Sequence, residues 1–206
     1  FHQGQICTTI GRHIVHESIA ESYARELTAK ALKLRMGDPF RSDVELGPLI
    51  NERQARNVER IVRETVAAGA KLALGGTRDG LYFTPTILTD VRPGMPAFDE
   101  EIFGPVAPII TFGNDEEAVA LANASHYGLV SSVVSPDLTR ASRIAERLHA
   151  GMVHVNDQTV VHEVYGPVGG VGASGNGWNY GTTVNADQFS EWQWHTVRAA
   201  LPKYPF

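Results

Sequence analysis

Cysteine is almost absent from this sequence: Cys7 is the single cysteine in 206 residues. One thiol cannot form a disulfide within the chain, so Cys7 either packs as a small apolar side chain or reacts as a thiolate. A buried, unreactive thiol is the more common role for a single cysteine. Because one cysteine also fits a reducing compartment, we expect a cytoplasmic location.

Long apolar runs and an excess of basic residues are also missing. No apolar run reaches the roughly 18 residues that cross a bilayer, and the N-terminus lacks the basic start and apolar core of a signal peptide. The net charge of -5 argues against a general binder of nucleic acid or of anionic membranes. The eight histidines show no metal-ligand spacing, so no metal site is expected.

Between residues 12 and 155 the sequence alternates strand-like and helix-like segments. Helix N-termini are indicated where a capping residue precedes Glu or Gln by three positions, at Ser18, Asn51 and Asn114, and another helix is predicted to begin near Pro136. This alternation predicts an α/β domain with a mostly parallel sheet. The predicted strands are 12–16, 71–74, 82–88, 108–112, 129–134 and 152–155.

The side-chain pattern adds detail to three of these segments. Pro85 cannot donate to a strand ladder, so it predicts an edge strand or a bulge at 82–88. The nearly continuous apolar run 129–134 predicts a strand buried on both faces. In the first helix an apolar stripe predicts the buried face, formed by Ile19, Tyr23, Leu27, Ala31 and Leu34.

The C-terminal part of the sequence breaks this pattern. Residues 156–188 are rich in Gly, Asn and Thr and have no helical period. Residues 190–198 have a strand-like sequence with Trp192 and Trp194, but no neighbouring segment can form a hairpin with them. We therefore expect an arm that pairs with a sheet elsewhere, in another subunit or in a further part of the protein. The alternative is an edge strand of the same sheet.

A glycine-rich segment at 170–175 matches the dinucleotide fingerprint G-x-G-x-x-G. That fingerprint binds pyrophosphate only where a strand ends and a helix begins. Here neither element is predicted next to it. A loop that packs close to another backbone is therefore the favoured interpretation.

Two further patterns leave alternatives open. A thiol hydrolase would need a histidine beside Cys7, and no local hydrolase signature appears in the sequence. Residues 100–106 contain Glu100 and Glu101 followed by Ile102 and Phe103. They could form a solvated acidic turn, or a carboxylate that accepts hydrogen bonds from a ribose diol, with an aromatic ring against a flat ligand.

A series of short motifs runs along the chain. In order, they are Phe1-x-x-Gly4-Gln5-x-Cys7, Gly47-Pro48-Leu49, Phe83-x-Pro85-Thr86, Glu101-Ile102-Phe103-Gly104-Pro105-Val106, Tyr127-Gly128-Leu129, Gly151-x-Val153-x-Val155-Asn156 and Pro167-x-Gly169-Gly170-x-x-x-Ser174-Gly175-x-Gly177. Taken together, these motifs resemble the aldehyde dehydrogenase superfamily along essentially the whole chain. The residues beside Cys7 (His2 and Ile6), and the later segment 156–159, look most similar to its aromatic-aldehyde branch, the benzaldehyde and vanillin dehydrogenases.

The resemblance implies a division of the chain. Residues 1–188 would be a three-layer catalytic domain, and residues 189–206 a β arm that assembles a homo-oligomer, a dimer or a tetramer. In the family, the nucleotide-binding domain, an Asn oxyanion donor and a water-activating Glu precede the cysteine motif, and this chain lacks them. We therefore expect that these 206 residues alone do not oxidise aldehydes with NAD.

The resemblance also implies a chemistry centred on Cys7. Its thiolate would attack a small-molecule aldehyde to give a thiohemiacetal, hydride would pass to NAD or NADP, and water would hydrolyse the resulting thioester. The backbone N–H of Cys7 would be one oxyanion donor. Glu101 would hold the nicotinamide ribose, and Phe103 would lie near the nicotinamide.

On the substrate side, the resemblance implies that Asn156 and the loop at 169–170 shape the pocket. At Val168 the family often has Phe, so the substrate tunnel is expected to be wider here. The local candidates for substrate contact are Val160, Val161, His162 and Tyr165.

Other functions stay open at this point. An acylating member of the same superfamily would pass the acyl group to coenzyme A rather than to water. A thiol hydrolase would cleave peptides or esters without nucleotide. A domain without enzymatic activity would only assemble with partners through its Trp-containing arm.

Overall fold

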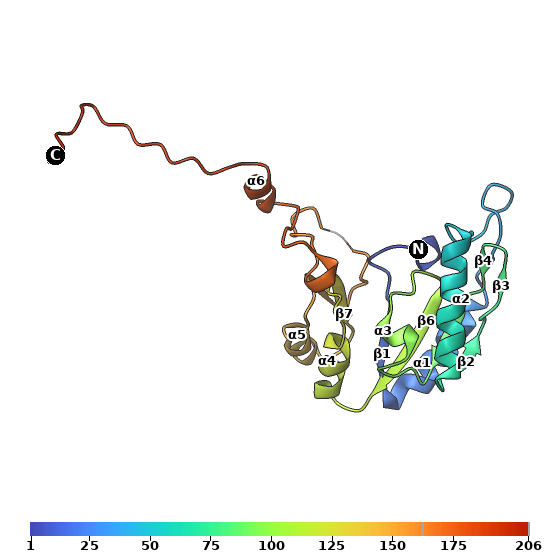
Figure 1. Ribbon diagram of the computed structural model, residues 1–206. Coiled ribbons are helices and arrows are strands. Elements are labelled where there is room, and N and C mark those ends of the chain that lie inside the picture. Colours follow the sequence, from blue (N-terminus) through green and yellow to red (C-terminus); the bar gives the residue numbers. More distant parts are fainter. Residues whose placement is uncertain (162, 206) are drawn as a thin grey trace.

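The centre of the fold is a four-stranded sheet in the order β1-β6-β5-β2 (Figure 1). β1 (His13–His16), β6 (Val106–Phe112) and β5 (Thr86–Thr89) run parallel to one another. β2 (Lys71–Leu74) joins β5 in the antiparallel direction at one edge. The predicted α/β class with a mostly parallel sheet is confirmed.

The structure is a computed structural model that describes residues 1–161 and 163–205. His162, a predicted substrate contact, lies outside the described residues. Within the described part, no helix is long and apolar enough to span a membrane.

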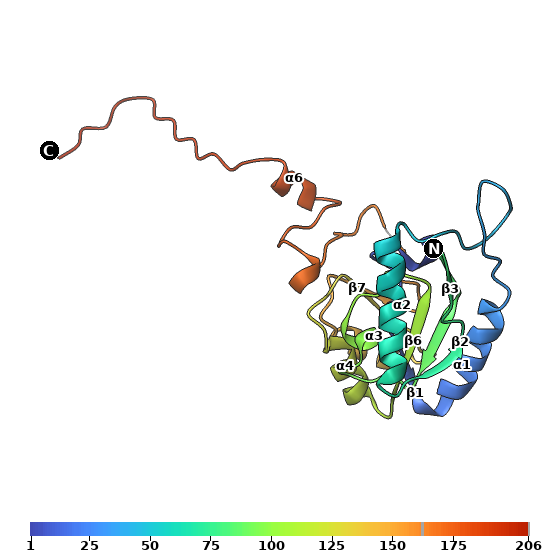
Figure 2. The same cartoon turned by 45° about the vertical axis from the view of Figure 1, so that its right-hand side comes forward.

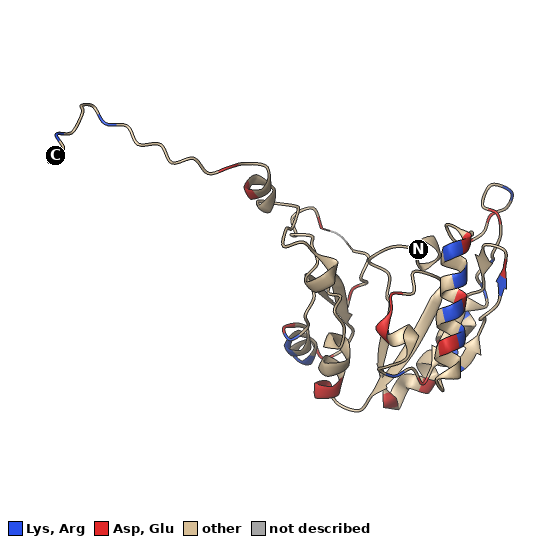
Figure 3. Ribbon diagram, viewed as in Figure 1, with Lys and Arg blue, Asp and Glu red and all other residues tan. Residues whose placement is uncertain are grey.

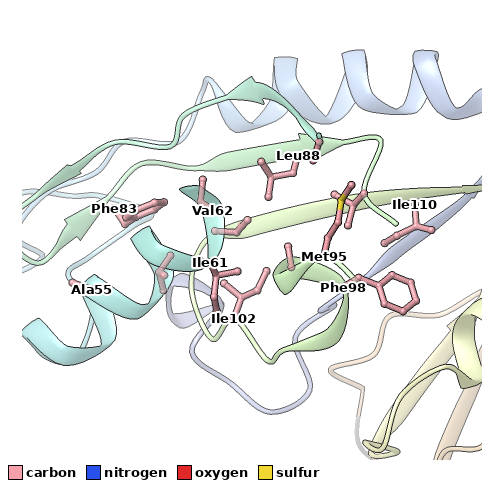
Figure 4. Packing of buried hydrophobic residues seen from close by; sticks show 14 of the residues in the cluster. Ala55, Ile61, Val62, Phe83, Leu88, Met95, Phe98, Ile102 and Ile110 are labelled. Atoms are coloured by element: carbon pink, nitrogen blue, oxygen red, sulfur yellow. The ribbon is translucent and has the colours of Figure 1, made fainter. Parts of the chain in front are cut away.

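Helices cover both faces of the sheet and give it three layers (Figure 2). α1 (Glu17–Ala31) packs on one face over Val15, Ile87 and Ile109. On the other face, α2 (Glu52–Ala67) and the short α3 (Pro96–Asp99) enclose the larger core. Figure 4 shows this core, in which side chains from the helices and the sheet interdigitate, among them Ile61, Val62, Phe83, Leu88, Met95, Phe98 and Ile110.

The start of α1 differs from the prediction. The helix begins one residue before Ser18, and the N-cap is His16, whose Nδ1 accepts a hydrogen bond from the Ser18 backbone N–H at 3.2 Å. Ile19 is 54% exposed, and Leu34 lies beyond the end of the helix. Packing against the sheet decides which side of α1 is buried. The residues of that side are Ala20, Tyr23, Ala24, Leu27 and Ala31.

α2 follows its local sequence signals. The Asn51 side chain accepts a hydrogen bond from the Gln54 N–H at 2.9 Å, as the predicted cap requires. The helix ends at Ala67, and Gly69 follows with a φ of 108°. Its buried face is formed by Ala55, Val58, Ile61, Val62 and Thr65. The exposed face carries interspersed acidic and basic side chains (Figure 3).

The segment around Pro85 corrects the edge-strand prediction. β4 (Tyr82–Phe83) pairs with β3 (Arg78–Asp79) in a separate two-stranded sheet. β5 begins after Pro85 and lies inside the main sheet, between β6 and β2. Because Pro85 falls in the gap between β4 and β5, its missing N–H interrupts neither ladder.

A smaller group of elements follows the main sheet in sequence. It contains α4 (Asp115–Asn123), β7 (Val130–Val133), α5 (Leu138–Ala145) and β8 (Met152–Val155). β7 and β8 form a parallel pair. All four residues of β7 are only half-buried, so the prediction of burial on both faces is wrong. Among the described residues the pair has no third strand beside it, which leaves much of β7 uncovered.

The chain after β8 contains the short elements η2 (Gly172–Ser174) and α6 (Val184–Gln188). Residues 190–205 then extend away from the body without forming a helix or strand (Figure 1). Trp192 is 97% exposed. The alternative of an edge strand in the chain's own sheet is therefore wrong, and pairing of this arm with another subunit stays a prediction.

Candidate active site

The loop that contains Cys7 is a succession of tight turns. Gly4 N–H donates to the Phe1 carbonyl at 2.8 Å, and Thr9 N–H donates to the Ile6 carbonyl at 3.0 Å. Gly4 has a φ of 73°, and a Cβ at this position would lie 2.2 Å from the carbonyl oxygen of Gly104. Only glycine allows this approach. The contact sets the cysteine loop directly against the 101–105 motif.

Two glutamine side chains fasten the same loop to residues 47–50. The Gln5 Oε1 accepts a hydrogen bond from the Ile50 N–H at 2.8 Å. With its amide oriented to satisfy both neighbours, Gln3 accepts from the Gly47 N–H at 2.7 Å and donates to the His2 carbonyl. The Gly47-Pro48-Leu49 motif thus supports the cysteine loop.

Cys7 is exposed, so the interpretation as a buried structural thiol is wrong. The turn places the neighbouring Thr8 inside instead, with an exposure of 2%. The Thr8 carbonyl accepts a hydrogen bond from the Thr159 Oγ1 at 2.6 Å. No hydrogen bond joins Cys7 to a histidine among the described residues. The Cys-His pair that a thiol hydrolase needs is therefore not present in the described part of the chain.

A cavity of about 570 Å³ opens beside Cys7. Val168, a predicted substrate contact, is among the residues that line it. Of the other described candidates, Val160 and Val161 are half-buried outside this lining, and Tyr165 is 84% exposed. The remaining lining residues are Thr8, Leu129, Met152, Gly169, Gly170, Ala173, Ser174, Gly175, Asn176, Trp178 and Tyr180.

Several of these wall residues were not predicted from the sequence. Trp178 and Tyr180 follow the glycine-rich loop, and Tyr180 forms an antiparallel bridge with Val168. Aromatic residues directly after a glycine-rich loop are the one sequence signal that could have suggested this position.

The glycine-rich loop packs against backbone, as predicted. A Cβ on Gly175 would lie 1.8 Å from the Gly170 carbonyl oxygen, and one on Gly151 would lie 1.8 Å from the Gly169 carbonyl oxygen. Within the loop, the only helical segment is the three-residue η2. The strand-to-helix setting of a dinucleotide site is not present there.

The motif around Phe103 is held by α2. Gln54 Nε2 donates to the carbonyls of Ile102 and Phe103, both at 2.9 Å. Phe103 has a φ of 51°, an uncommon conformation for a bulky residue. A Cβ on Gly104 would lie 2.6 Å from Val58 Cγ2, so the motif lies tightly on the helix.

The two adjacent acids of this motif have different surroundings. Arg60 Nη2 bonds Glu100 Oε2 at 2.6 Å, and this pairing raises the pKa of Arg60. Glu101 is exposed and has no hydrogen bond or ion pair to another described residue. Glu101 is therefore the acid that is available to a ligand.

Asn156 supports the fold near the cavity. Its Oδ1 accepts from the Ser135 N–H at 2.8 Å, and its Nδ2 donates to the Ser135 carbonyl at 2.9 Å. The side chain is thus engaged with the connection between β7 and α5. The expectation that Asn156 shapes the substrate pocket stays a prediction.

Titratable groups near the site do not form a metal cluster. The described residues contain no group of three His, Cys, Asp or Glu side chains that could hold a metal ion. Arg12 contributes structurally: it donates to the carbonyls of Leu121 at 3.0 Å and Ala122 at 2.8 Å and lies over the Phe98 ring. Burial lowers the pKa of Arg12, and the Asp99 charge opposes that shift.

The chain is similar to known proteins along essentially its whole length. The model of the aldehyde dehydrogenase family matches residues 1–195. A benzaldehyde dehydrogenase (NAD+) of Pseudomonas putida is 45% identical over 205 residues, which are 100% of this chain and 42% of that protein.

Two solved structures are similar in fold. A salicylaldehyde dehydrogenase from Pseudomonas putida G7, complexed with salicylaldehyde, matches with a TM-score of 0.94 and 34% identity over 99% of this chain and 42% of that one. A betaine aldehyde dehydrogenase from Staphylococcus aureus in complex with NAD+ has a TM-score of 0.86 and 34% identity, covering 92% of this chain and 39% of that one.

The chain belongs to the aldehyde dehydrogenase family. The predicted membership is confirmed, as is the predicted similarity to enzymes of aromatic aldehydes. The chain spans 42% of the length of the benzaldehyde dehydrogenase that it matches.

Proposed function

We propose that this chain supplies the nucleophile and one wall of the substrate pocket in an NAD(P)-dependent oxidation of an aromatic aldehyde to a carboxylic acid. Cys7 is the proposed nucleophile, and Val168 is the proposed wall residue within the cavity. Two relatives support the aromatic substrate class, since their names specify benzaldehyde and salicylaldehyde.

One observation carries the proposal: the contact between Gly4 and Gly104. It joins the exposed thiol to the segment that contains Glu101 and Phe103. A thiolate and a hydride acceptor must meet at the same carbon of the substrate, so their binding segments must be neighbours.

The residues present fit a nicotinamide cofactor. The Glu101 carboxylate has no partner among the described residues and can accept both hydrogen bonds of a ribose diol. Phe103 is fixed beside it by Gln54 and can lie near the flat nicotinamide ring. When bound, NAD(P)+ supplies the hydride acceptor of the reaction.

In the proposed reaction the Cys7 thiolate attacks the aldehyde carbon and forms a C–S bond, and the carbonyl oxygen becomes an oxyanion. The Cys7 backbone N–H stabilises that oxyanion. The carbon then loses hydride, which leaves a thioester on Cys7. Water adds to the thioester and releases the acid and the thiol, so two electrons leave the aldehyde in each cycle.

The test is formation of NADH from benzaldehyde by the intact protein and by its Cys7→Ser and Thr9→Ser variants. We expect Cys7→Ser to reduce kcat by about a thousandfold or more, because serine is a much weaker nucleophile without a base beside it. Thr9→Ser, a substitution two residues away, should retain most of the activity. NADH formation by Cys7→Ser at an unreduced rate would refute the proposal.

The arm at 189–206 is proposed to assemble a homo-oligomer. Its support is the exposure of Trp192 and Trp194 in a segment that pairs with none of the chain's own described strands. Exposed strand-like segments with large apolar side chains pair with other chains. Deletion of residues 189–206 should lower the mass measured by size-exclusion light scattering, and an unchanged mass would contradict the assembly role.

A further inference from the structure

Thr159 makes a long-range contact with the cysteine loop that its sequence position does not suggest. Its Oγ1 donates to the carbonyl of Thr8 at 2.6 Å, across 151 residues of sequence, and the contact is buried. Because the acceptor is the carbonyl of the residue after Cys7, the hydrogen bond fixes the backbone on the C-terminal side of the thiol.

The other fastenings of the loop act on its N-terminal side. Gln5 holds it to residues 47–50, and Gly4 packs on Gly104. Both belong to the body formed around the main sheet. Thr159 belongs instead to the loop that follows β8.

The Thr8 side chain does not help to attach the cysteine loop. Thr8 is 2% exposed, yet its Oγ1 has no hydrogen-bond partner among the described residues. The attachment at this point therefore passes through the Thr8 backbone and depends on the Thr159 hydroxyl.

We propose that Thr159 is a positioning residue for Cys7. Its hydroxyl keeps Thr8 inside the turn and thereby keeps the thiol facing the cavity. This inference rests on the proposed role of Cys7 as the nucleophile.

The loop of Thr159 also carries the predicted substrate contacts Val160 and Val161. The Asp157 carbonyl accepts from the Ser132 Oγ at 2.5 Å, which anchors the start of this loop on β7.

The test compares Thr159→Val, Thr159→Ser and a control, Thr65→Val, in the intact protein. Valine keeps the shape of threonine and removes the hydroxyl, while serine keeps the hydroxyl. Thr65 is a buried threonine in α2 whose Oγ1 accepts from the Ala97 N–H at 2.9 Å. Thr65→Val thus removes a comparable buried hydrogen bond away from Cys7.

Two readouts are measured: hydrogen–deuterium exchange of the peptide that covers residues 1–12, and kcat with KM for benzaldehyde. In Thr159→Val we expect exchange to be faster by roughly threefold or more, because the loop opens more often. We expect kcat to fall about tenfold with little change in KM, because the nucleophile is misplaced while substrate binding persists. Thr159→Ser should restore both, and Thr65→Val should change neither.

Failure of the positioning role of Thr159 can be distinguished from failure of the proposed function. If exchange in Thr159→Val equals that of Thr65→Val, or if Thr159→Ser does not restore it, the positioning role is refuted. If exchange changes as expected but the unaltered protein oxidises no aldehyde, the attachment of the loop is supported and the proposed function falls.

Discussion

Gly4 and Gly104 meet backbone to backbone, with so little space that a Cβ on Gly4 would lie 2.2 Å from the Gly104 carbonyl oxygen. The contact joins two motifs that lie 100 residues apart in the sequence. The close approach of the cysteine loop to the 101–106 motif thus depends on the absence of a side chain at Gly4.

Gly4→Ala should destabilise the protein more than an ordinary glycine replacement. Gly80 has a similar positive φ, 56°, but a Cβ there would meet nothing within 4 Å. Gly80→Ala therefore carries only the conformational cost, about 1 kcal/mol. Gly4→Ala adds a backbone clash, and we expect a loss of about 2–4 kcal/mol together with loss of activity. Urea unfolding measures both variants, and equal losses would contradict the importance of the contact.

Gln54→Leu should weaken cofactor binding. The substitution leaves the carbonyls of Ile102 and Phe103 without their donor, so Phe103 should leave its left-handed conformation. We expect the KM for NAD to rise about tenfold, which corresponds to a loss of about 1.4 kcal/mol of binding free energy.

Asn51→Ala is the matched control for Gln54→Leu. It removes the N-cap of the same helix and should cost about 1 kcal/mol of stability, while both carbonyls keep their donor. The KM for NAD should therefore stay unchanged. An equal rise in KM for both variants would mean that loss of helix stability, rather than the Gln54 contact, controls binding.

Glu101→Gln should affect cofactor binding, whereas Glu100→Gln should affect only stability. Glu101 has no partner among the described residues, so its replacement should leave stability unchanged and raise the KM for NAD about tenfold. Glu100 pairs with Arg60 on the surface, so its replacement should cost no more than about 1 kcal/mol and leave KM unchanged. Thermal unfolding measures the stability of both variants, and initial rates measure their KM for NAD. A raised KM in Glu100→Gln alone would assign the cofactor contact to Glu100 instead of Glu101.

The two acids illustrate what the sequence could and could not predict. Asn51 and Asn114 were recognisable as helix caps because both partners of each cap lie within four residues. The roles of Glu100 and Glu101 depend on Arg60, which lies 40 residues earlier and arrives only when α2 packs on the motif. Thr159 and Thr8 are separated by still more of the sequence, 151 residues. Local chemistry thus predicted the elements, whereas folding decided which polar groups remain free.

Burial makes His13 a pH-sensitive element of the main sheet. Burial lowers the pKa of His13 from 6.5 to about 4, and its Nδ1 lies 2.7 Å from the Tyr23 hydroxyl. Between these two values the unfolded chain binds a proton that the folded chain does not. The stabilising contribution is therefore complete above pH 6.5 and is lost as the pH falls towards 4.

The shift corresponds to a loss of at most about 3 kcal/mol across that window. Urea unfolding at several pH values should show this slope in the unaltered protein. His13→Gln removes the titrating group and should flatten the slope, even though it lowers stability at neutral pH by disturbing the contact with Tyr23. The control is His149→Gln, because His149 is exposed between α5 and β8 and its replacement should leave the slope unchanged. An unflattened slope in His13→Gln would assign the pH dependence to other groups.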